Sequence, residues 1–405
     1  MQKNSAATLI ANLIFSTTQM TSGKKFLKQI IFPKRLNLLF LSIFLFAISA
    51  SINAVVLPTI LSVHGVSATS IGLAFSTDVF GGICMSFFLH NIVKKLGIMR
   101  ALFFSALLYA LVTAMIYFYQ SFPLWLLFAF VMGNCFFAYN ITRQAWMNIL
   151  LESHRRSVAL GIFSMVLASG LAVGPMVVRL IGAGNYNSIL LSGFFTLLSF
   201  FALIPMKASS RVRVGSMRIP LLQFFKNNPR CFLARFFLDL QTYITFTLTV
   251  VFGTHIGFTF EQAGLFITAY MISGFVDVWV GFALKKINPY KMILLGYIGC
   301  LGCFALVWLF HESYIFLFAV FFFYGCFVAA IYVSVFHITN NDYKKHHLVA
   351  ANSTFQMIGS IGSLCGSLLG GFLIDAIGAD GFPIVIISAC ALYIILSHIY
   401  DRKIS

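Results

Sequence analysis

Long apolar stretches, separated by short polar or charged segments, follow one another along almost the whole chain from residue 37. An α-helix rises about 1.5 Å per residue, so each stretch is long enough to cross about 30 Å of hydrocarbon. The pattern predicts an all-α polytopic membrane protein with twelve transmembrane helices, at residues 37–62, 68–93, 98–119, 123–150, 157–181, 187–205, 231–254, 262–284, 291–310, 315–338, 348–375 and 382–400.

The composition excludes a soluble protein. Of the 405 residues, 60% are hydrophobic and only 9% are charged, and 47 are Phe. A soluble chain carries about 25% charged residues to cover its surface. A soluble fold of this length has no interior large enough to bury so many aromatic side chains.

The formal net charge of +17 would suggest nucleic-acid binding if the basic residues were clustered in a folded domain. With the N-terminus inside, however, 24 of the 27 Lys and Arg fall in the segments that face the cytoplasm, and the outer loops hold none. This distribution follows the positive-inside rule. It predicts that both termini are cytoplasmic and that no nucleic acid is bound.

The longest polar interval, residues 206–230, divides the spans into two sets of six. "IGLAFSTDVFGG" (71–82) aligns with "AGLFITAYMISG" (263–274), and a Lys-Lys pair follows each. Parallel repeats of this kind are typical of transporters. We expect a cytoplasmic tail (1–36), a six-helix bundle (37–205), a basic cytoplasmic linker (206–230) and a second, pseudo-symmetric bundle with a short tail (231–405).

The loop after the second span reads "HNIVKKLGIMR" and is similar to the G-x-x-x-D-R-x-G-R-R signature of the major facilitator superfamily. The glycine and two basic positions match, whereas His90 and Lys94 stand where that family has Gly and Asp. The resemblance covers residues 37–400 and implies two six-helix bundles. In that family the loop helps to control switching between inward- and outward-open states, which implies gating roles for Lys94, Lys95, Gly97 and Arg100.

Two further motifs carry the resemblance. "GLAVGP" (170–175) is similar to the G-x-x-x-G-P motif of antiporters and drug exporters in the family. Gly170 and Gly174 give a flat surface for close helix packing, and Pro175 permits a bend, so a gating role and simple packing both stay open. "RQAWMNILLESHRRS" (143–157) resembles the signature of a bacterial group, which implies a location in the bacterial inner membrane.

Charged residues within the spans are candidates for function, because an Asp or Arg near the bilayer centre costs about 2.5–3.5 kcal/mol. Arg235 and Asp239 are four residues apart, so they share a helix face and are expected to form an ion pair, either structural or in contact with substrate. In the resembled fold, spans one, four, seven and ten line a central cavity. The residues expected there are Asn53, Asn140, Arg143, Gln144, Arg235, Asp239, Thr242, Tyr324 and Tyr332.

Charges near the outer ends of the spans suggest a gate. The resemblance makes Arg179–Glu261 and Asp375–His64 candidate pairs that would close the outer side, with simple extension of the side chains toward the interface as the alternative. Asp277 lies near the inner end of the eighth span, with Lys285 or other charges of the inner loop as candidate partners. We expect a structural role on the gate side for Asp277.

Asp78 lies near mid-membrane in the second span, with Ala74 and Gly82 one turn away on either side. Burial disfavours the charged form of a carboxylate, so Asp78 is the candidate proton-coupling site. The alternative is a structural hydrogen bond to the small-residue eleventh span, at Gly359, Gly362, Gly366 and Gly370.

These features predict a secondary active transporter of a small organic solute that works by alternating access and is driven by a proton gradient. The partial antiporter motif favours efflux of drug-like molecules or metabolites, with nutrient or siderophore uptake as the alternative. The rival classes are a membrane enzyme and a channel. An enzyme is not expected, since the chain has no phosphate-binding G-x-x-x-x-G-K-[ST], H-E-x-x-H or nucleophile-elbow motif. A channel would need a continuous polar pore lining, and the repeated halves fit a rocking carrier better. We expect no cofactor and no metal, a monomer, and no partners besides substrate and lipid.

Overall fold

The fold is described from a computed structural model, which covers residues 34–119, 121–150, 156–182, 185, 187–206, 220–284, 286–343 and 348–402. In these residues the secondary structure is helical throughout. The first six spans are α3 (Lys34–Val63), α4 (Ala68–Leu96), α5 (Ile98–Phe118), α6 (Phe122–Leu150), α7 (Arg156–Ile181) and α8 (Asn187–Phe201). The other helices are α9 (Leu221–Asn227), α10 (Pro229–His255), α11 (Phe260–Ile272), η2 (Ser273–Val276), α12 (Asp277–Ala283), α13 (Pro289–Leu309), α14 (Tyr314–Asp342), α15 (Leu348–Ile377), η3 (Gly378–Asp380) and α16 (Gly381–Arg402).

The predicted all-α membrane fold is confirmed. Ten stretches of the described helices are long and apolar enough to cross a membrane; one of these joins α15 and α16, and α8 is a shorter apolar helix. The observed helices begin and end within a few residues of the predicted spans, except that the eighth span is divided into α11, η2 and α12. The predicted tail at 1–33 and most of the linker, 207–219, lie outside the described residues.

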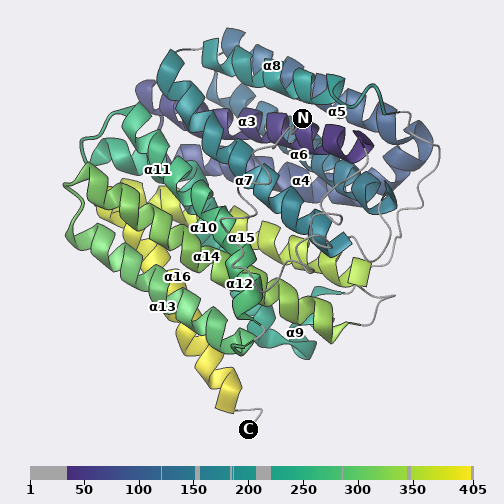
Figure 1. The fold of residues 1–405 in the computed structure, drawn as a ribbon. Coiled ribbons are helices and arrows are strands. Elements are labelled where there is room, and N and C mark those ends of the chain that lie inside the picture. Colours follow the sequence, from purple (N-terminus) through teal and green to yellow (C-terminus); the bar gives the residue numbers. More distant parts are fainter. Residues whose placement is uncertain are drawn as a thin grey trace, which may run out of the picture.

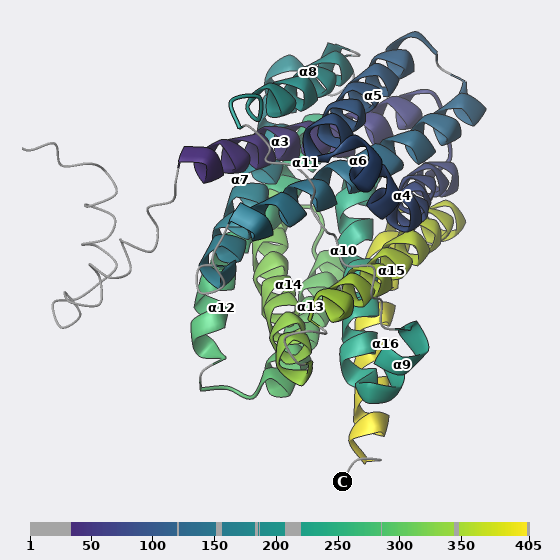
Figure 2. The ribbon, with the colours of Figure 1, turned by 90° about the vertical axis from the view of Figure 1, so that its right-hand side faces the viewer.

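Two groups of helices make up the molecule (Figure 1). Helices α3–α8, coloured purple to teal, pack mainly against one another, as do helices α10–α16, coloured teal-green to yellow. The groups meet where α4 lies beside α15, as Figure 2 also shows, and where α7 lies beside α11. Helix α10 also contacts α3 from the opposite group.

Glycines and small polar residues let the two groups approach closely. The Cα of Gly72 on α4 faces the carbonyl oxygen of Ser367 on α15, so closely that a Cβ atom would not fit. The hydroxyl of Ser76 donates to the carbonyl of Leu364 at 2.9 Å, and that of Thr268 donates to the carbonyl of Ala172 at 2.9 Å. All these contacts lie in the helix halves that the charge pattern assigns to the outer side.

The first motif proposed for gating, the loop after α4, contains a residue with a clear backbone role. Gly97 ends α4 with a φ of 80°, a conformation that favours glycine, and its N–H donates to the carbonyl of Val93 at 2.9 Å. Lys94 and Lys95 occupy the last turn of α4, where positive charge interacts favourably with the helix dipole. Gating by this loop stays a prediction.

The predicted close packing at the glycines of the fifth span is present. Gly170 packs against the carbonyl of Phe44 and the side chain of Ala47, and Gly174 packs against Ser51. These contacts hold α7 against α3 within one group of helices. Pro175 lies inside α7, one residue after Gly174.

Candidate functional site

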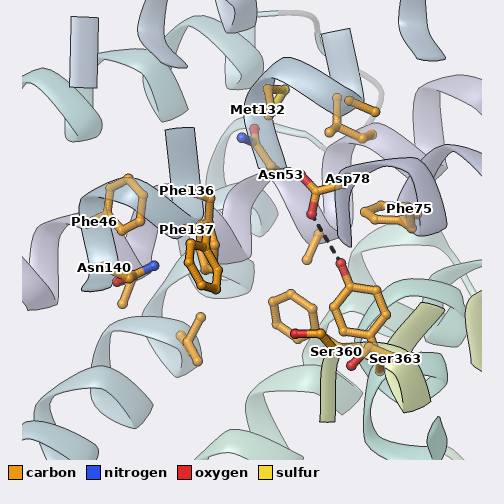
Figure 3. A pocket seen from close by; sticks show the side chains of 18 of the residues that line it. Phe46, Asn53, Phe75, Asp78, Met132, Phe136, Phe137, Asn140, Ser360 and Ser363 are labelled. Carbon is orange, nitrogen blue, oxygen red and sulfur yellow. Dashed lines mark hydrogen bonds between the residues drawn. The ribbon is translucent and has the colours of Figure 1, made fainter. Parts of the chain in front are cut away.

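A cavity of about 480 Å³ lies between the two groups of helices. Its walls come from α3, α4, α5, α6 and α7 on one side and from α10, α11 and α15 on the other. Aromatic side chains form much of the surface, and Figure 3 shows Phe136 and Phe137 between Asn140 and Asp78. The polar residues on the wall include Asn53, Asp78, Asn140, Gln144, Asp239, Thr242, Tyr243, Gln356, Ser360 and Ser363.

Asp78 lies on the cavity wall and contacts the opposite group of helices. The hydroxyl of Tyr243, on α10, donates to Oδ2 of Asp78 at 3.2 Å (dashed line in Figure 3). The backbone of Asp78 packs directly on Gly133 of α6, which has no room for a Cβ atom. The carboxylate is thus held at a fixed point of one group and bonded to the other.

The alternative partner suggested for Asp78 was wrong. The four glycines of α15 face α10: Gly359 lies against the Arg235–Asp239 pair, and the other three lie against backbone or side-chain atoms of Phe236, Leu240, Ile244 and Leu248. Ser363 of α15 lines the cavity, and Ser367 faces α4. Glycine spacing identified a close-packing face but could not show which helix it meets.

Asn53 and Asn140 are oriented by their neighbours. The Nδ2 of Asn53 donates to the hydroxyl of Tyr109 at 2.8 Å, and Oδ1 of Asn53 is buried without a hydrogen-bond partner among the described residues. The Oδ1 of Asn140 accepts from Arg143 at 2.6 Å, so the amide nitrogen of Asn140 keeps its donors for another group. Asn53 therefore offers a hydrogen-bond acceptor to a bound solute, and Asn140 offers hydrogen-bond donors.

Arg143 was expected to line the cavity, but its side chain is fully buried behind the wall. The guanidinium lies between the rings of Phe46 and Tyr139, with its Cζ 4.7 and 4.2 Å from their centroids. It also donates to the carbonyl of Ser42 at 2.9 Å. Aromatic faces and carbonyl oxygens stabilise this cation, and Arg143 fixes the orientation of Asn140 rather than contacting the cavity itself.

The predicted ion pair on α10 is present, with Arg235 Nη2 2.6 Å from Asp239 Oδ2. Asp239 and Thr242 line the cavity, whereas Arg235 is directed away from the wall. Arg235 also donates to Oε1 of Gln356 on α15 at 3.3 Å and lies over the ring of Phe355. The pair therefore links α10 to α15 and presents only its carboxylate side to the cavity.

Removing one member of this pair should destabilise the protein more than removing both. Either Arg235→Gln or Asp239→Asn leaves a buried charge without its partner, at a cost of about 3–5 kcal/mol. The double substitution leaves two neutral side chains, so its cost should be clearly smaller than the sum of the single costs. Thermal unfolding of the four proteins in detergent measures this coupling, and additive losses would contradict it.

The tenth span does not contribute as expected. Tyr324 of α14 is fully buried behind the wall, in contact with the rings of Tyr270 and Phe304, and accepts a hydrogen bond from Thr245 at 3.3 Å. Tyr332 packs beside Arg235 and is also absent from the wall. Helix α15 contributes Gln356, Ser360 and Ser363 to the wall, to which no described residue of α14 contributes.

One of the candidate gate residues, Asp375, lies at the contact between the two groups. Both carboxylate oxygens of Asp375, at the end of α15, accept hydrogen bonds from α4: from the N–H of Ala68 at 2.9 Å and that of Thr69 at 2.8 Å. The sequence had suggested His64 as the partner; its Nδ1 lies 2.7 Å from the carbonyl oxygen of Ile60 in its own helix. The N-terminus of α4 was not foreseen as a partner.

The remaining gate assignments stay predictions. Glu261 lies in the first turn of α11 and Arg179 in the last turn of α7. Asp277 begins α12, directly after the break in the eighth span, and its suggested partner Lys285 lies outside the described residues. Arg100 is exposed in the first turn of α5.

Sequence reasoning missed Tyr243, Gln356, Ser360 and Ser363. Tyr243 follows Asp239 by four residues, so the helical period could have placed it on the same face of α10. The three α15 residues carried no comparable signal, since the resemblance assigned the cavity wall to other spans.

Comparison with known proteins places this arrangement in context. The family model described as Major Facilitator Superfamily matches residues 39–358 and 231–403. An "MFS-type transporter" of Gibberella moniliformis (strain M3125 / FGSC 7600) is 24% identical over 269 residues, which cover 62% of this chain. The aligned region spans 63% of the length of that relative.

Solved structures share the fold at low sequence identity. The nucleoside transporter NupG has a TM-score of 0.76 at 14% identity, covering 92% of this chain and 100% of NupG. A bacterial homologue of the human lysosomal transporter Spinster, in an inward-facing and occupied conformation, has a TM-score of 0.69 at 14% identity, covering 89% of this chain and 94% of its own. With the family model matching most of its length, this chain belongs to the major facilitator superfamily of membrane transporters.

Proposed function

We propose that this protein carries a small, uncharged organic solute across the membrane by alternating access, and that a proton moving through Asp78 drives the cycle. One observation carries the proposal: the carboxylate of Asp78 lies on the cavity wall of one group of helices and accepts a hydrogen bond from Tyr243 of the other. The protonation of Asp78 and the contact between the groups therefore depend on each other.

The hydrogen bond gives the direction of this coupling. A hydroxyl that donates to a carboxylate stabilises its charged form. The described contacts close the side predicted to be outer, so this conformation corresponds to one that is closed to the outside. Separating the groups on that side would remove Tyr243 and favour protonation of Asp78. A proton would then bind from outside and leave toward the inside, as an inward-directed proton gradient requires.

The cavity wall supports a solute with a flat apolar surface and both kinds of hydrogen-bonding group. A volume of about 480 Å³ lies within the usual range for small-molecule sites. The buried Oδ1 of Asn53 lacks a donor, and the amide nitrogen of Asn140 can serve an acceptor. Aromatic rings between them suit a ring system. A nucleoside, named in the description of NupG, has this chemistry.

The direction of solute movement is proposed from the sequence. The partial G-x-x-x-G-P motif at 170–175 favours exchange of the solute for protons, and hence efflux. Uptake with protons is the second candidate, since the same carboxylate serves either cycle.

Purified protein in liposomes with an imposed pH gradient tests the proposal. Candidate solutes are uridine, adenosine, neutral sugars and uncharged apolar drug-like molecules, with a pH-sensitive dye inside the vesicles. We expect at least one solute to cause saturable proton movement together with its own flux. Flux that rises linearly with concentration would indicate a channel, and saturable flux without proton movement would exclude the coupling.

A further inference from the structure

Two buried arginines lie behind the wall of the central cavity, one in each group of helices. Arg143 belongs to α6 and Arg235 to α10, and neither side chain is part of the wall. Each guanidinium lies over aromatic rings and donates to a backbone carbonyl, that of Ser42 in one case and that of Phe355 in the other. The two arginines are therefore held in the same way.

Each arginine also binds the side-chain oxygen of an amide on the cavity wall. Nη2 of Arg143 donates to Oδ1 of Asn140 at 2.6 Å, and Nη2 of Arg235 donates to Oε1 of Gln356 at 3.3 Å. Asn140 and Gln356 both line the cavity, from opposite groups of helices. A guanidinium has donors and no acceptor, so the amide atom that faces it must be the oxygen. This contact fixes the orientation of both amides.

The amide nitrogens are thereby left for the cavity. Figure 3 shows the nitrogen of Asn140 on the side of Phe137, which is also part of the wall. Among the described residues, none accepts a hydrogen bond from the amide nitrogen of Asn140 or of Gln356. Hydrogen bonds in series polarise one another, so a cation bound at the oxygen makes each N–H a stronger donor. Each group of helices thus presents a fixed donor.

Asn140 cannot easily turn over to present its oxygen to the cavity. Arg143 is fully buried, and among the described residues no carboxylate pairs with it. The oxygen of Asn140 is therefore one of the few acceptors available to this cation. A rotated amide would set donors against donors inside the protein, which is costly.

We propose that Asn140 and Gln356 select the solute by its carbonyl oxygens, with Arg143 and Arg235 as the residues that position them. This inference rests on the proposed function, in which the cavity binds a small uncharged solute. An amino group in place of a carbonyl would meet the amide donors with further donors and leave polar groups unpaired. Uracil and hypoxanthine rings satisfy the site, whereas cytosine and adenine, in which an amino group replaces a ring carbonyl, do not.

Binding of matched nucleosides to the purified protein tests the selection. Isothermal titration calorimetry, without any gradient, would compare uridine with cytidine and inosine with adenosine. Within each pair we expect the carbonyl compound to bind about tenfold more tightly, the difference made by one hydrogen bond. Equal affinities within both pairs, or binding by none of the four, would overturn the inference. Proton coupling would be unaffected by that result, because the liposome experiment tests it separately.

Asn140→Asp separates selection from folding. The substitution keeps the size of the side chain, replaces the donor by an acceptor and gives Arg143 a carboxylate partner. The melting temperature should therefore not fall, while the preference for uridine over cytidine should be lost or reversed. Asn187→Asp, the same change at the exposed first residue of α8, is the matched control and should leave both affinities unchanged.

Two further variants test the other parts of the arrangement. Gln356→Met removes the second donor but leaves Arg235 paired with Asp239, so it should weaken uridine binding more than cytidine binding. Arg143→Met frees the amide of Asn140 to rotate and should bring the two affinities together. An undiminished preference for uridine in both Asn140→Asp and Gln356→Met would show that other groups select the solute, and would overturn the proposal.

Discussion

Asp78→Asn is expected to abolish solute accumulation driven by a pH gradient, while exchange of solute between the two sides continues. Asparagine keeps the size of the side chain and can still accept from Tyr243, but it does not exchange a proton at any pH of the assay. The alternating movement itself needs no proton once the site is permanently uncharged. Liposomes loaded with solute, with and without an imposed gradient, separate the two activities.

Two further variants make this result specific. Asp380→Asn removes an exposed carboxylate near the predicted outer ends of α15 and α16 and should leave gradient-driven accumulation intact. Tyr243→Phe removes the hydroxyl that favours the charged form of Asp78, so accumulation should persist but require a higher pH. Full accumulation by Asp78→Asn would remove Asp78 from the coupling mechanism.

Gly72→Ala is expected to hold the protein open on its outer side. The added Cβ atom would meet the carbonyl group of Ser367 across the contact between α4 and α15. Overpacking of this kind costs about 1–3 kcal/mol, which shifts a two-state equilibrium by about 5- to 150-fold. Neither group of helices is disturbed internally, so the protein should fold while net transport falls sharply.

Hydrogen exchange measured by mass spectrometry can detect this shift. Peptides from the predicted outer ends of α4 and α15 should exchange faster in Gly72→Ala, and also in Gly371→Ala, which acts at the same contact from the other side. Gly302→Ala on α13 is the matched control, since nothing lies within 4 Å of the added atom. Unchanged exchange at the outer ends would show that this contact does not form the gate.

The spans were predictable because the bilayer imposes a simple rule on the sequence. Each must be long and apolar, and the basic residues must remain on one side. The break in the eighth span was not predictable in this way. Its residues 273–276 stay apolar or small through the change to a 3₁₀ helix, so hydropathy does not register it.

The candidate site was predicted less well, because it depends on which helix faces meet. The sequence identified Asp78 and the Arg235–Asp239 pair from their charge. It assigned Arg143 to the cavity for the same reason, although aromatic rings and carbonyl groups accommodate the guanidinium behind the wall. Tyr243 carried no charge to attract notice, yet its hydroxyl links Asp78 to the other group of helices.

The contact between Asp375 and α4 also bears on how the protein tolerates mutation. The donors are the backbone N–H groups of Ala68 and Thr69, and every amino acid except proline supplies such a group. Drift at positions 68 and 69 therefore cannot easily weaken this link, whereas a bond between two side chains would be lost by substitution at either one. Mutations that weaken this contact should therefore be concentrated at the codon for Asp375.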